Sequence, residues 1–160
     1  DEYGLHDIPI ISIAKGKIGY VFTPIKNLSV RIFSETGFKI GDSEQQSLDF
    51  FLGGYGNNLI NNMVPFYGYD FLSLGADSYI KSLAEVDVEI FKNNHITLSG
   101  NFANVENKLY SSGNWLSMPD YSGYALGYGV ETFLGPMEVK YSYSPEVKES
   151  QWFFSLGFWF

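Results

Sequence analysis

Three carboxylates stand at alternate positions in residues 79–91, where the sequence reads YIKSLAEVDVEIF. Alternate residues of a β-strand point to the same face, so Glu85, Asp87 and Glu89 would form one acidic row. Paired carboxylates can act as a general acid and a general base. We favour a structural interpretation, in which this row lines the wet wall of an internal lumen. Candidate ionic partners on neighbouring strands are Arg31, Lys81 and Lys140.

Residues 41–43, Gly-Asp-Ser, superficially resemble the nucleophile block of a lipase. Nucleophilic hydrolysis needs a serine, a base and an orienting acid, but the sequence has no G-x-S-x-G elbow. Neither of its two histidines, His6 and His95, stands in a late D-x-x-H setting, and two are too few for a histidine-rich metal site. We therefore expect a turn at 41–43, a strand start at His95, and no enzyme activity, metal or cofactor.

The composition is acidic, aromatic and rich in glycine. The 10 Lys and Arg against 18 Asp and Glu give a net charge of -8, which argues against nucleic acid as a partner. Aromatic residues make up 18% of the chain, with 17 Gly and no Cys. This combination suits an outer-membrane β-barrel, whose aromatic girdles mark both membrane interfaces, although an aromatic-rich soluble β-barrel remains the alternative. The chain begins at Asp1 without a visible signal peptide, so we expect a processed or excised piece.

Alternation with a period of two dominates the sequence and predicts β-strands. There is no long apolar run of the kind that forms a transmembrane helix. Most of the predicted strands could reach the ~9–11 residues that a tilted strand needs to cross a bilayer. We expect about eight: residues about 10–22, about 28–38, 48–53, 79–91, 95–103, 123–134, 136–146 and 152–160.

The placement of aromatic residues indicates which strand face meets lipid. A soluble barrel packs its apolar face inside, whereas a membrane barrel turns that face outward. Tyr20, Tyr124, Tyr143 and Trp152 stand near strand ends on the apolar face, as interfacial girdles predict. The opposite face would then line a polar lumen. The lumen-facing charges that we predict are Glu85, Asp87, Glu89, Glu131 and Lys140.

The C-terminal stretch WFFSLGFWF, residues 152–160, has the form of the last strand of an outer-membrane barrel. Such a strand can end on an aromatic residue because its end lies at a membrane interface, paired in a ladder. One row of alternate residues would face lipid: Trp152, Phe154, Leu156, Phe158 and Phe160.

The lengths of the connections offer a second test, because outer-membrane barrels alternate short periplasmic turns with longer extracellular loops. With a periplasmic C-terminus, the short turns at 92–95 and 134–136 are periplasmic, and the long connections at 54–78 and 104–121 are extracellular. The alternation blurs upstream. Residues 41–46 should be periplasmic but are of moderate length, and 23–27 should be extracellular but are short.

Residues 48–160 resemble the C-terminal half of the surface-antigen barrel of the insertase and two-partner-secretion superfamily, and residues 1–47 do so weakly. The segments that carry the resemblance include FLGGYGNN, PFYGYD, HITLSGNFANVEN and WFFSLGFWF. The nearest version is the barrel fused to patatin-like phospholipases in Bacteroidota, a type Vd autotransporter-like protein. The resemblance implies a sixteen-stranded barrel, of which this chain supplies strands nine to sixteen.

The resemblance also implies a loop that folds back into the lumen and carries a V-R-G-[FY] motif. Phe66, Tyr67, Gly68 and Tyr69 occupy the place of this motif, with Tyr67 instead of its arginine. The family's F-x-D-x-G motif is assigned to residues 102–106, where only Phe102 matches fully. The row that ends at Phe160 is similar to the signal by which the barrel assembly machinery recognises its substrates.

The expected fold is therefore an all-β, antiparallel transmembrane β-barrel, in one domain over residues 1–160. It is either half of a sixteen-stranded barrel or a closed eight-stranded barrel. The expected function is a non-enzymatic anchor or translocator in the Gram-negative outer membrane, with a patatin-like lipase encoded upstream as its passenger. The alternatives are a self-contained structural or adhesive barrel and a soluble lipocalin-like barrel. Expected partners are outer-membrane lipids, the assembly machinery, and the remaining barrel strands or another subunit.

Overall fold

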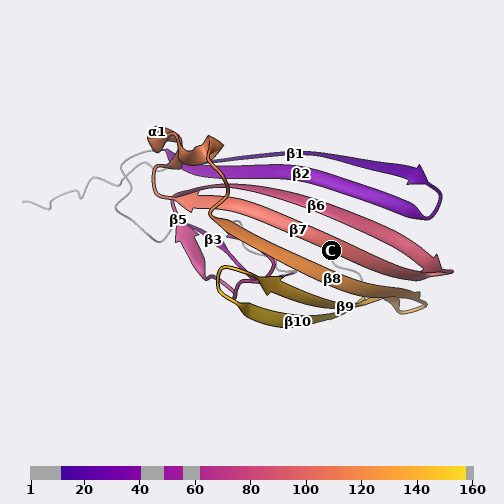
Figure 1. Cartoon of the computed structure of the whole chain (residues 1–160). Helices are drawn as coiled ribbons and strands as arrows, with labels where there is room; N and C mark the ends of the chain where they lie inside the picture. The colour runs from indigo at the N-terminus through magenta and orange to yellow at the C-terminus, as the bar shows by residue number, and fades with distance from the viewer. Residues whose placement is uncertain (1–11, 41–48, 56–61, 158–160) are drawn as a thin grey trace, which may run out of the picture.

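A computed structural model describes residues 12–40, 49–55 and 62–157. Seven long strands form one antiparallel sheet in which neighbours in sequence are neighbours in space, except that β2 is followed by β6 (Figure 1). This confirms the predicted all-β, antiparallel class. The strands are β1 (Ser12–Ile25), β2 (Leu28–Ile40), β6 (Ser78–Phe91), β7 (Asn94–Glu106), β8 (Tyr121–Thr132), β9 (Gly135–Ser144) and β10 (Glu149–Leu156).

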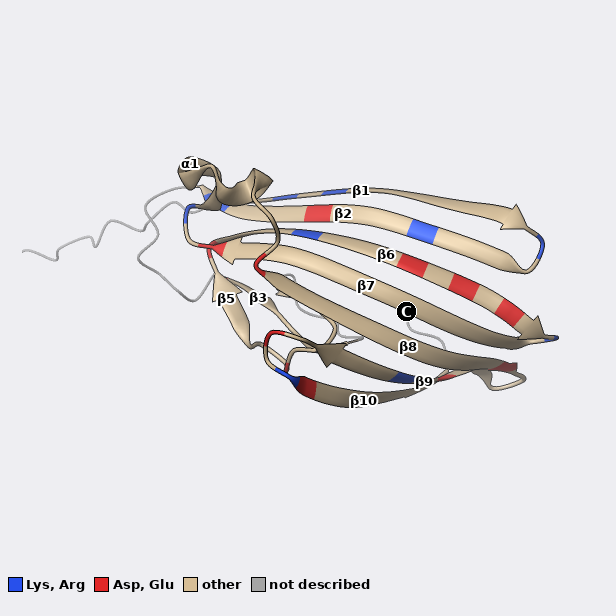
Figure 2. Cartoon of the chain, in the orientation of Figure 1, with Lys and Arg blue, Asp and Glu red and all other residues tan. Residues whose placement is uncertain are grey.

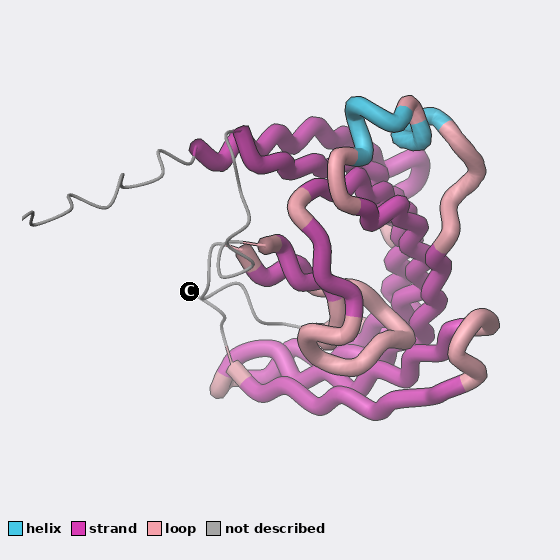
Figure 3. Tube along the Cα trace, turned by 90° about the vertical axis from the view of Figure 1, so that its left-hand side faces the viewer, coloured by secondary structure: helices cyan, strands magenta, loops and turns pink. Residues whose placement is uncertain are grey.

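The sheet curves into an open trough (Figure 3). Within the described residues, β1 pairs only with β2 and β10 pairs only with β9, so no ladder joins the two edges. The seven strands are therefore not a closed barrel by themselves.

A second, three-stranded sheet lies inside the trough (Figure 3). It comprises β3 (Phe50–Leu52), β4 (Met63–Val64) and β5 (Leu74–Ala76), in the order β4-β3-β5. The expectation that 48–53 is one of about eight barrel strands is therefore wrong. The short apolar run forms a strand, but Gly53 and Gly54 follow it with positive φ angles of 140° and 67° and turn the chain inside the trough.

This correction restores the alternation of connection lengths. The short turns 26–27, 92–93 and 133–134 lie at one end of the sheet, here called the turn end. The longer connections 107–120 and 145–148 lie at the other end, the loop end, where β2 also ends and β6 begins. The short connection at 23–27 is expected on the extracellular side only if 48–53 is counted as a membrane-spanning strand. Without that strand it falls on the side of the short turns. The expected turn at 41–46 lies outside the described residues.

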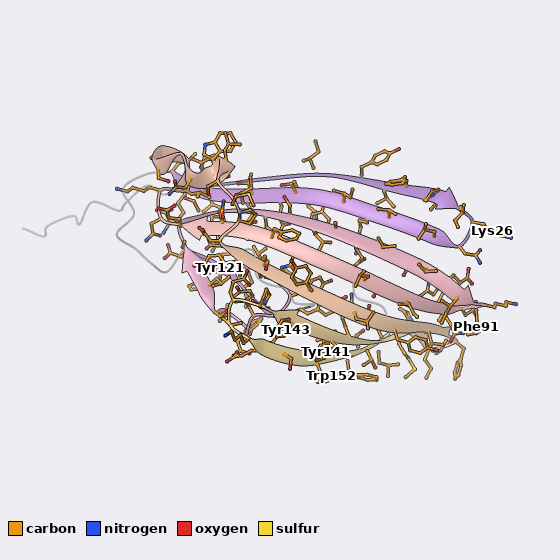
Figure 4. The ribbon with its side chains drawn as sticks, viewed as in Figure 1. Lys26, Phe91, Tyr121, Tyr141, Tyr143 and Trp152 are labelled. Atoms are coloured by element: carbon orange, nitrogen blue, oxygen red, sulfur yellow. The ribbon has the colours of Figure 1, made fainter. Side chains whose placement is uncertain are left out.

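The register separates charged from apolar side chains. Pairs such as Glu35 with Lys81 and Arg31 with Glu85 face the concave side, and acidic bands follow one another along β6 (Figure 2). The opposite positions of the seven strands carry a charged residue only at Glu106, at the loop end. This convex face is apolar and exposed: Trp152 is 74% exposed, with its ring 5.0 Å from that of Tyr141 (Figure 4).

An exposed apolar face needs a solvent other than water. The soluble, lipocalin-like alternative requires the reverse arrangement, with the apolar face inside, and the structure therefore argues against it. Within the described part of the chain, no helix is both long and apolar enough to cross a bilayer. The helical segments are α1 (Leu109–Ser112) and η2 (Asn114–Leu116).

Candidate functional site

The connection between β2 and β6 enters the trough, and we call its described residues, 49–55 and 62–77, the luminal loop. Its apolar side chains form a small core against the concave side of the sheet. Tyr79 of β6 and Ala103 of β7 complete this core from the wall. The loop residues buried there are Phe50, Leu52, Val64, Phe66 and Tyr69. The loop thus packs against the concave side of β6 and β7.

The tip of the luminal loop, residues 66–69, is docked onto the backbone of the barrel wall. The Tyr67 N–H donates to Oδ1 of Asn101 at 2.9 Å. A Cβ on Gly123 of β8 would lie 1.8 Å from the Tyr67 carbonyl oxygen, so only glycine permits this approach. Gly68 has φ +78°, and a Cβ there would lie 2.6 Å from the Ser144 nitrogen. Gly68 and Gly123 therefore allow the backbone of the luminal loop to approach the backbone of the wall closely.

A cluster of polar groups around Lys140 of β9 contacts the luminal loop from the concave face of the sheet. The Lys140 ammonium, 3% exposed, lies 3.0 Å from Glu138 Oε1 and 3.8 Å from Glu85 Oε2. It also donates to the hydroxyls of Tyr55 and Tyr67 at 3.3 and 3.4 Å. These five residues are the Lys140 cluster. A buried ammonium with carboxylate and hydroxyl partners from both sides ties the loop to the wall.

The two tyrosines keep their protons. Burial raises the pKa of the Tyr55 and Tyr67 phenols, and the nearby Lys140 charge opposes this shift without cancelling it. The Tyr55 hydroxyl therefore donates to Glu138 Oε2 at 3.0 Å. At this cluster the loop is therefore held through hydrogen bonds of two neutral tyrosines, while Asp49 at the start of the loop forms an ion pair with Lys39 of β2.

Ionic contacts extend the cluster across the concave face. Glu85 accepts from Arg31 on β2 at 2.5 Å and from the Ser99 hydroxyl on β7 at 2.7 Å. Closer to the turn end, Asp87 lies 2.9 Å from His95 Nδ1. The network therefore links β2, β6, β7 and β9.

Gly127 on β8 leaves space for this network. A Cβ at this position would lie 2.2 Å from the Thr97 hydroxyl and 2.9 Å from Cε of Lys140. A larger residue would push the lysine away from its carboxylate partners.

The luminal loop also contacts the edge strand β10. The Tyr55 ring meets Phe153 edge to face, with centroids 4.4 Å apart. Gln151 donates to Asp70 at 2.5 Å. A cavity of about 350 Å³ lies between the loop and this strand. The luminal loop therefore contacts the wall as far as β10, the last strand of the sheet within the described residues.

A second cavity, of about 330 Å³, opens toward the turn end below Tyr55. Asp87, His95, Glu131 and Glu138 line it. Within the described ranges, no group of three or more His, Asp or Glu is arranged to hold a metal ion. Ser155 of β10 also lines this second cavity.

The predicted residues are distributed as follows. Glu85 and Lys140 meet in the Lys140 cluster. Asp87 pairs with His95, and Glu89 accepts from the Asn93 N–H at 3.1 Å. Glu131 is an exposed residue at the turn end of β8. Trp152, Phe154 and Leu156 lie on the convex face. Phe158, Phe160 and His6 lie outside the described residues, as does the segment 41–43.

The assignment of F-x-D-x-G to residues 102–106 places its polar residue at Asn104, and this position is wrong for a contact with the luminal loop. Asn104 shares the convex face with Phe102 and bonds to residues 114–120. The residue that meets the loop is Asn101, fully buried on the concave face. Its place in the polar row with Thr97 and Ser99 was a signal that could have identified it.

An open sheet with an apolar convex face, a charged concave face and an inserted loop defines the wall of a membrane-spanning β-barrel. The sequence matches the OMP85 superfamily over residues 6–160, and the chain belongs to that superfamily. Membership supports a translocator role in the Gram-negative outer membrane, since proteins of this superfamily are translocators and insertases rather than enzymes. A search of curated proteins found no match.

Proposed function

We propose that this chain is the C-terminal half of a sixteen-stranded outer-membrane barrel that anchors a passenger and translocates or displays it. The seven long strands then correspond to strands ten to sixteen, and residues 1–160 act as one domain. The open sheet carries this proposal: β1 and β10 are both edges within the described residues. An unpaired edge in lipid leaves backbone groups without partners, so each edge needs a further strand.

The luminal loop supports the larger barrel over the closed eight-stranded alternative. A barrel of eight strands has an interior just wide enough for its own side chains. Here a three-stranded sheet and the tyrosines of the Lys140 cluster occupy the trough. The space that they need favours a wider barrel, completed by strands from elsewhere.

The orientation that fits best puts the loop end outside the cell and the turn end, with the C-terminus, in the periplasm. Outer-membrane barrels keep short turns on the periplasmic side and long loops outside, and the two ends of this sheet differ in that way. The row Trp152, Phe154 and Leu156 then runs toward the periplasm, where the assembly machinery would recognise it together with Phe158 and Phe160.

The passenger that we propose is a patatin-like lipase encoded upstream. This part of the proposal rests on the resemblance of residues 48–160 to the patatin-linked surface-antigen barrel. The chain itself would be the non-enzymatic part, and catalysis would belong to a G-x-S-x-G segment before it. The upstream reading frame is the direct check: a signal peptide immediately before Asp1 would contradict the passenger.

Gel migration tests the half-barrel. The full-length protein and the isolated 160 residues are refolded in the same phospholipid vesicles, and unheated samples are compared with boiled ones. We expect a heat-modifiable, fast-migrating band from the full-length protein only, because the isolated sheet has two open edges. A fast-migrating, protease-resistant band from the 160 residues would instead show an eight-stranded closure.

Cysteine labelling tests the orientation. The described chain contains no cysteine, so single cysteines report cleanly in a cysteine-free full-length protein. Glu149→Cys at the loop end should react with a membrane-impermeant maleimide on intact cells, and Lys92→Cys at the turn end should react only after the outer membrane is permeabilised. The reverse pattern would overturn the orientation without affecting the half-barrel.

A further inference from the structure

Residues 107–120, here called the outer loop, fold onto the convex face of the sheet instead of into the trough. Figure 3 shows its helical segments outside the curve of the sheet, opposite the luminal loop. The Tyr110 ring packs against Phe38 with centroids 5.3 Å apart, and its hydroxyl bonds to Thr36. Both contacts lie on convex-face positions of β2, so the outer loop covers the apolar surface at the loop end.

The outer loop is held in this position by a buried side chain of the wall. Asn104, 3% exposed, donates to the Asn114 carbonyl and the Ser117 hydroxyl at 3.2 Å each, and it accepts from the Asp120 N–H at 2.8 Å. Leu109 is fully buried at the same place. These contacts fix the outer loop on the wall as a shaped element.

The loop turns a second apolar surface outward. Leu116 is 76% exposed and Met118 is 86% exposed, and Trp115 beside them is 39% exposed. Such a patch on a fixed backbone marks a contact surface. Polar residues bracket it in sequence, with Lys108 and Ser111 before and Asp120 after.

We propose that the outer loop is an interfacial anchor that inserts Trp115, Leu116 and Met118 into the headgroup layer of the membrane at the loop end. The Trp115 ring lies 6.0 Å from that of Tyr110, which packs on the apolar convex face of β2, and α1 also contacts β6 and β7. β6 and β7 have 14 and 13 residues, more than the ~9–11 that cross the hydrocarbon. The extra length lies under the loop, which sets the patch at the depth where tryptophan gathers at interfaces.

This surface fits a lipid layer better than a protein partner. A β-barrel meets lipid with its convex face, and the outer loop lies on that face. The proposal does not depend on the number of strands that complete the barrel or on the passenger. If the orientation proposed above holds, the leaflet is the outer one.

Depth-dependent fluorescence quenching tests the anchor. Leu116→Cys and Met118→Cys, each in the cysteine-free full-length protein, are labelled with an environment-sensitive fluorophore and reconstituted in phosphatidylcholine vesicles. We expect a blue shift, strong quenching by headgroup nitroxide lipid, weaker quenching by nitroxide deep in the acyl chain, and little quenching by aqueous iodide. Ser111→Cys on the same loop is the polar control, and Leu98→Cys on the convex face of β7 is the deep control.

Two results would overturn the proposal. Iodide quenching at Leu116→Cys and Met118→Cys as strong as at Ser111→Cys would show that the patch lies in water. Protection from both iodide and lipid nitroxide would show that protein covers the patch. Heat-modifiable migration of each labelled variant verifies that the barrel has folded, so that neither result reflects misfolding.

Discussion

The backbone N–H of Tyr67 donates to Oδ1 of Asn101 at 2.9 Å, and this bond joins the tip of the luminal loop to the centre of β7. Asn101 is fully buried. The bond is therefore made away from bulk water, where an unpaired N–H is costly. This side chain of the wall thus helps to fix the position of the loop tip, and the Tyr67 hydroxyl accepts from Lys140.

Asn101→Ala should weaken this docking. The Tyr67 N–H would be left buried without an acceptor, which lowers the free energy of unfolding by about 1–3 kcal/mol. Urea unfolding of the full-length protein in lipid vesicles measures this change. Ser111→Ala on the exposed outer loop is the control and should leave the midpoint unchanged. Equal midpoints for the two variants would contradict the structural role of Asn101.

Gly123→Ala should displace the loop tip for a steric reason. The added Cβ would stand 1.8 Å from the Tyr67 carbonyl oxygen, and two backbones would have to separate. Gly129→Ala on the same strand is a matched control, because its Cβ would find no atom nearer than 3.7 Å. We expect chymotrypsin to cleave the aromatic luminal loop faster in Gly123→Ala than in Gly129→Ala. Cleavage at equal rates would contradict the close approach.

The sequence predicts the barrel wall well, because the period of two records which face of each strand meets lipid. The same pattern fails at 48–53. Three residues of a luminal strand and three of a spanning strand alternate in the same way, and only strand length and the following glycines distinguish them. The sequence does show that Asn101 and Asn104 lie on opposite faces of the strand, because alternate residues share a face. Asn104 shares its face with Phe102, and Asn101 does not.

The outer loop could not be predicted in this way. Its position depends on bonds between residues far apart in register and sequence, such as Tyr110 with Thr36. The connection lengths predict only that 104–121 is a long extracellular loop. They carry no information about which face of the sheet such a loop covers, because that choice is made by tertiary contacts.

Lys140→Met should destabilise the barrel more than the same substitution of a surface lysine. It removes the buried cation that Glu138 and Glu85 share, and breaking a buried pair typically costs about 3–5 kcal/mol. Lys17→Met is the control: the Lys17 side chain is 62% exposed and 3.9 Å from Glu35, so its loss should cost less than about 1 kcal/mol. Urea unfolding in vesicles compares them, and similar costs would argue against a clamp at Lys140.

Glu146, in the turn between β9 and β10, should make the loop end sensitive to acid. Burial acts to raise its pKa, but hydrogen bonds from the Ser122 and Ser144 hydroxyls, at 2.7 and 2.8 Å, outweigh it, so the pKa is lowered. Tyr69 of the luminal loop also donates to it, at 3.3 Å. A folded-state pKa below the unfolded value means that the stabilisation is present above the unfolded pKa, about 4.3, and is lost as the pH falls through the folded value.

The pH dependence separates Glu146 from the other carboxylates. Glu146→Gln should lower stability at neutral pH and remove part of the further loss seen between neutral pH and about pH 3.5. Glu149→Gln, at an exposed neighbouring position, should keep the wild-type acid response. Urea midpoints of the full-length protein at the two pH values measure both effects. The same acid response in Glu146→Gln and wild type would mean that another carboxylate carries it, because an uncharged side chain has no proton left to bind at this site.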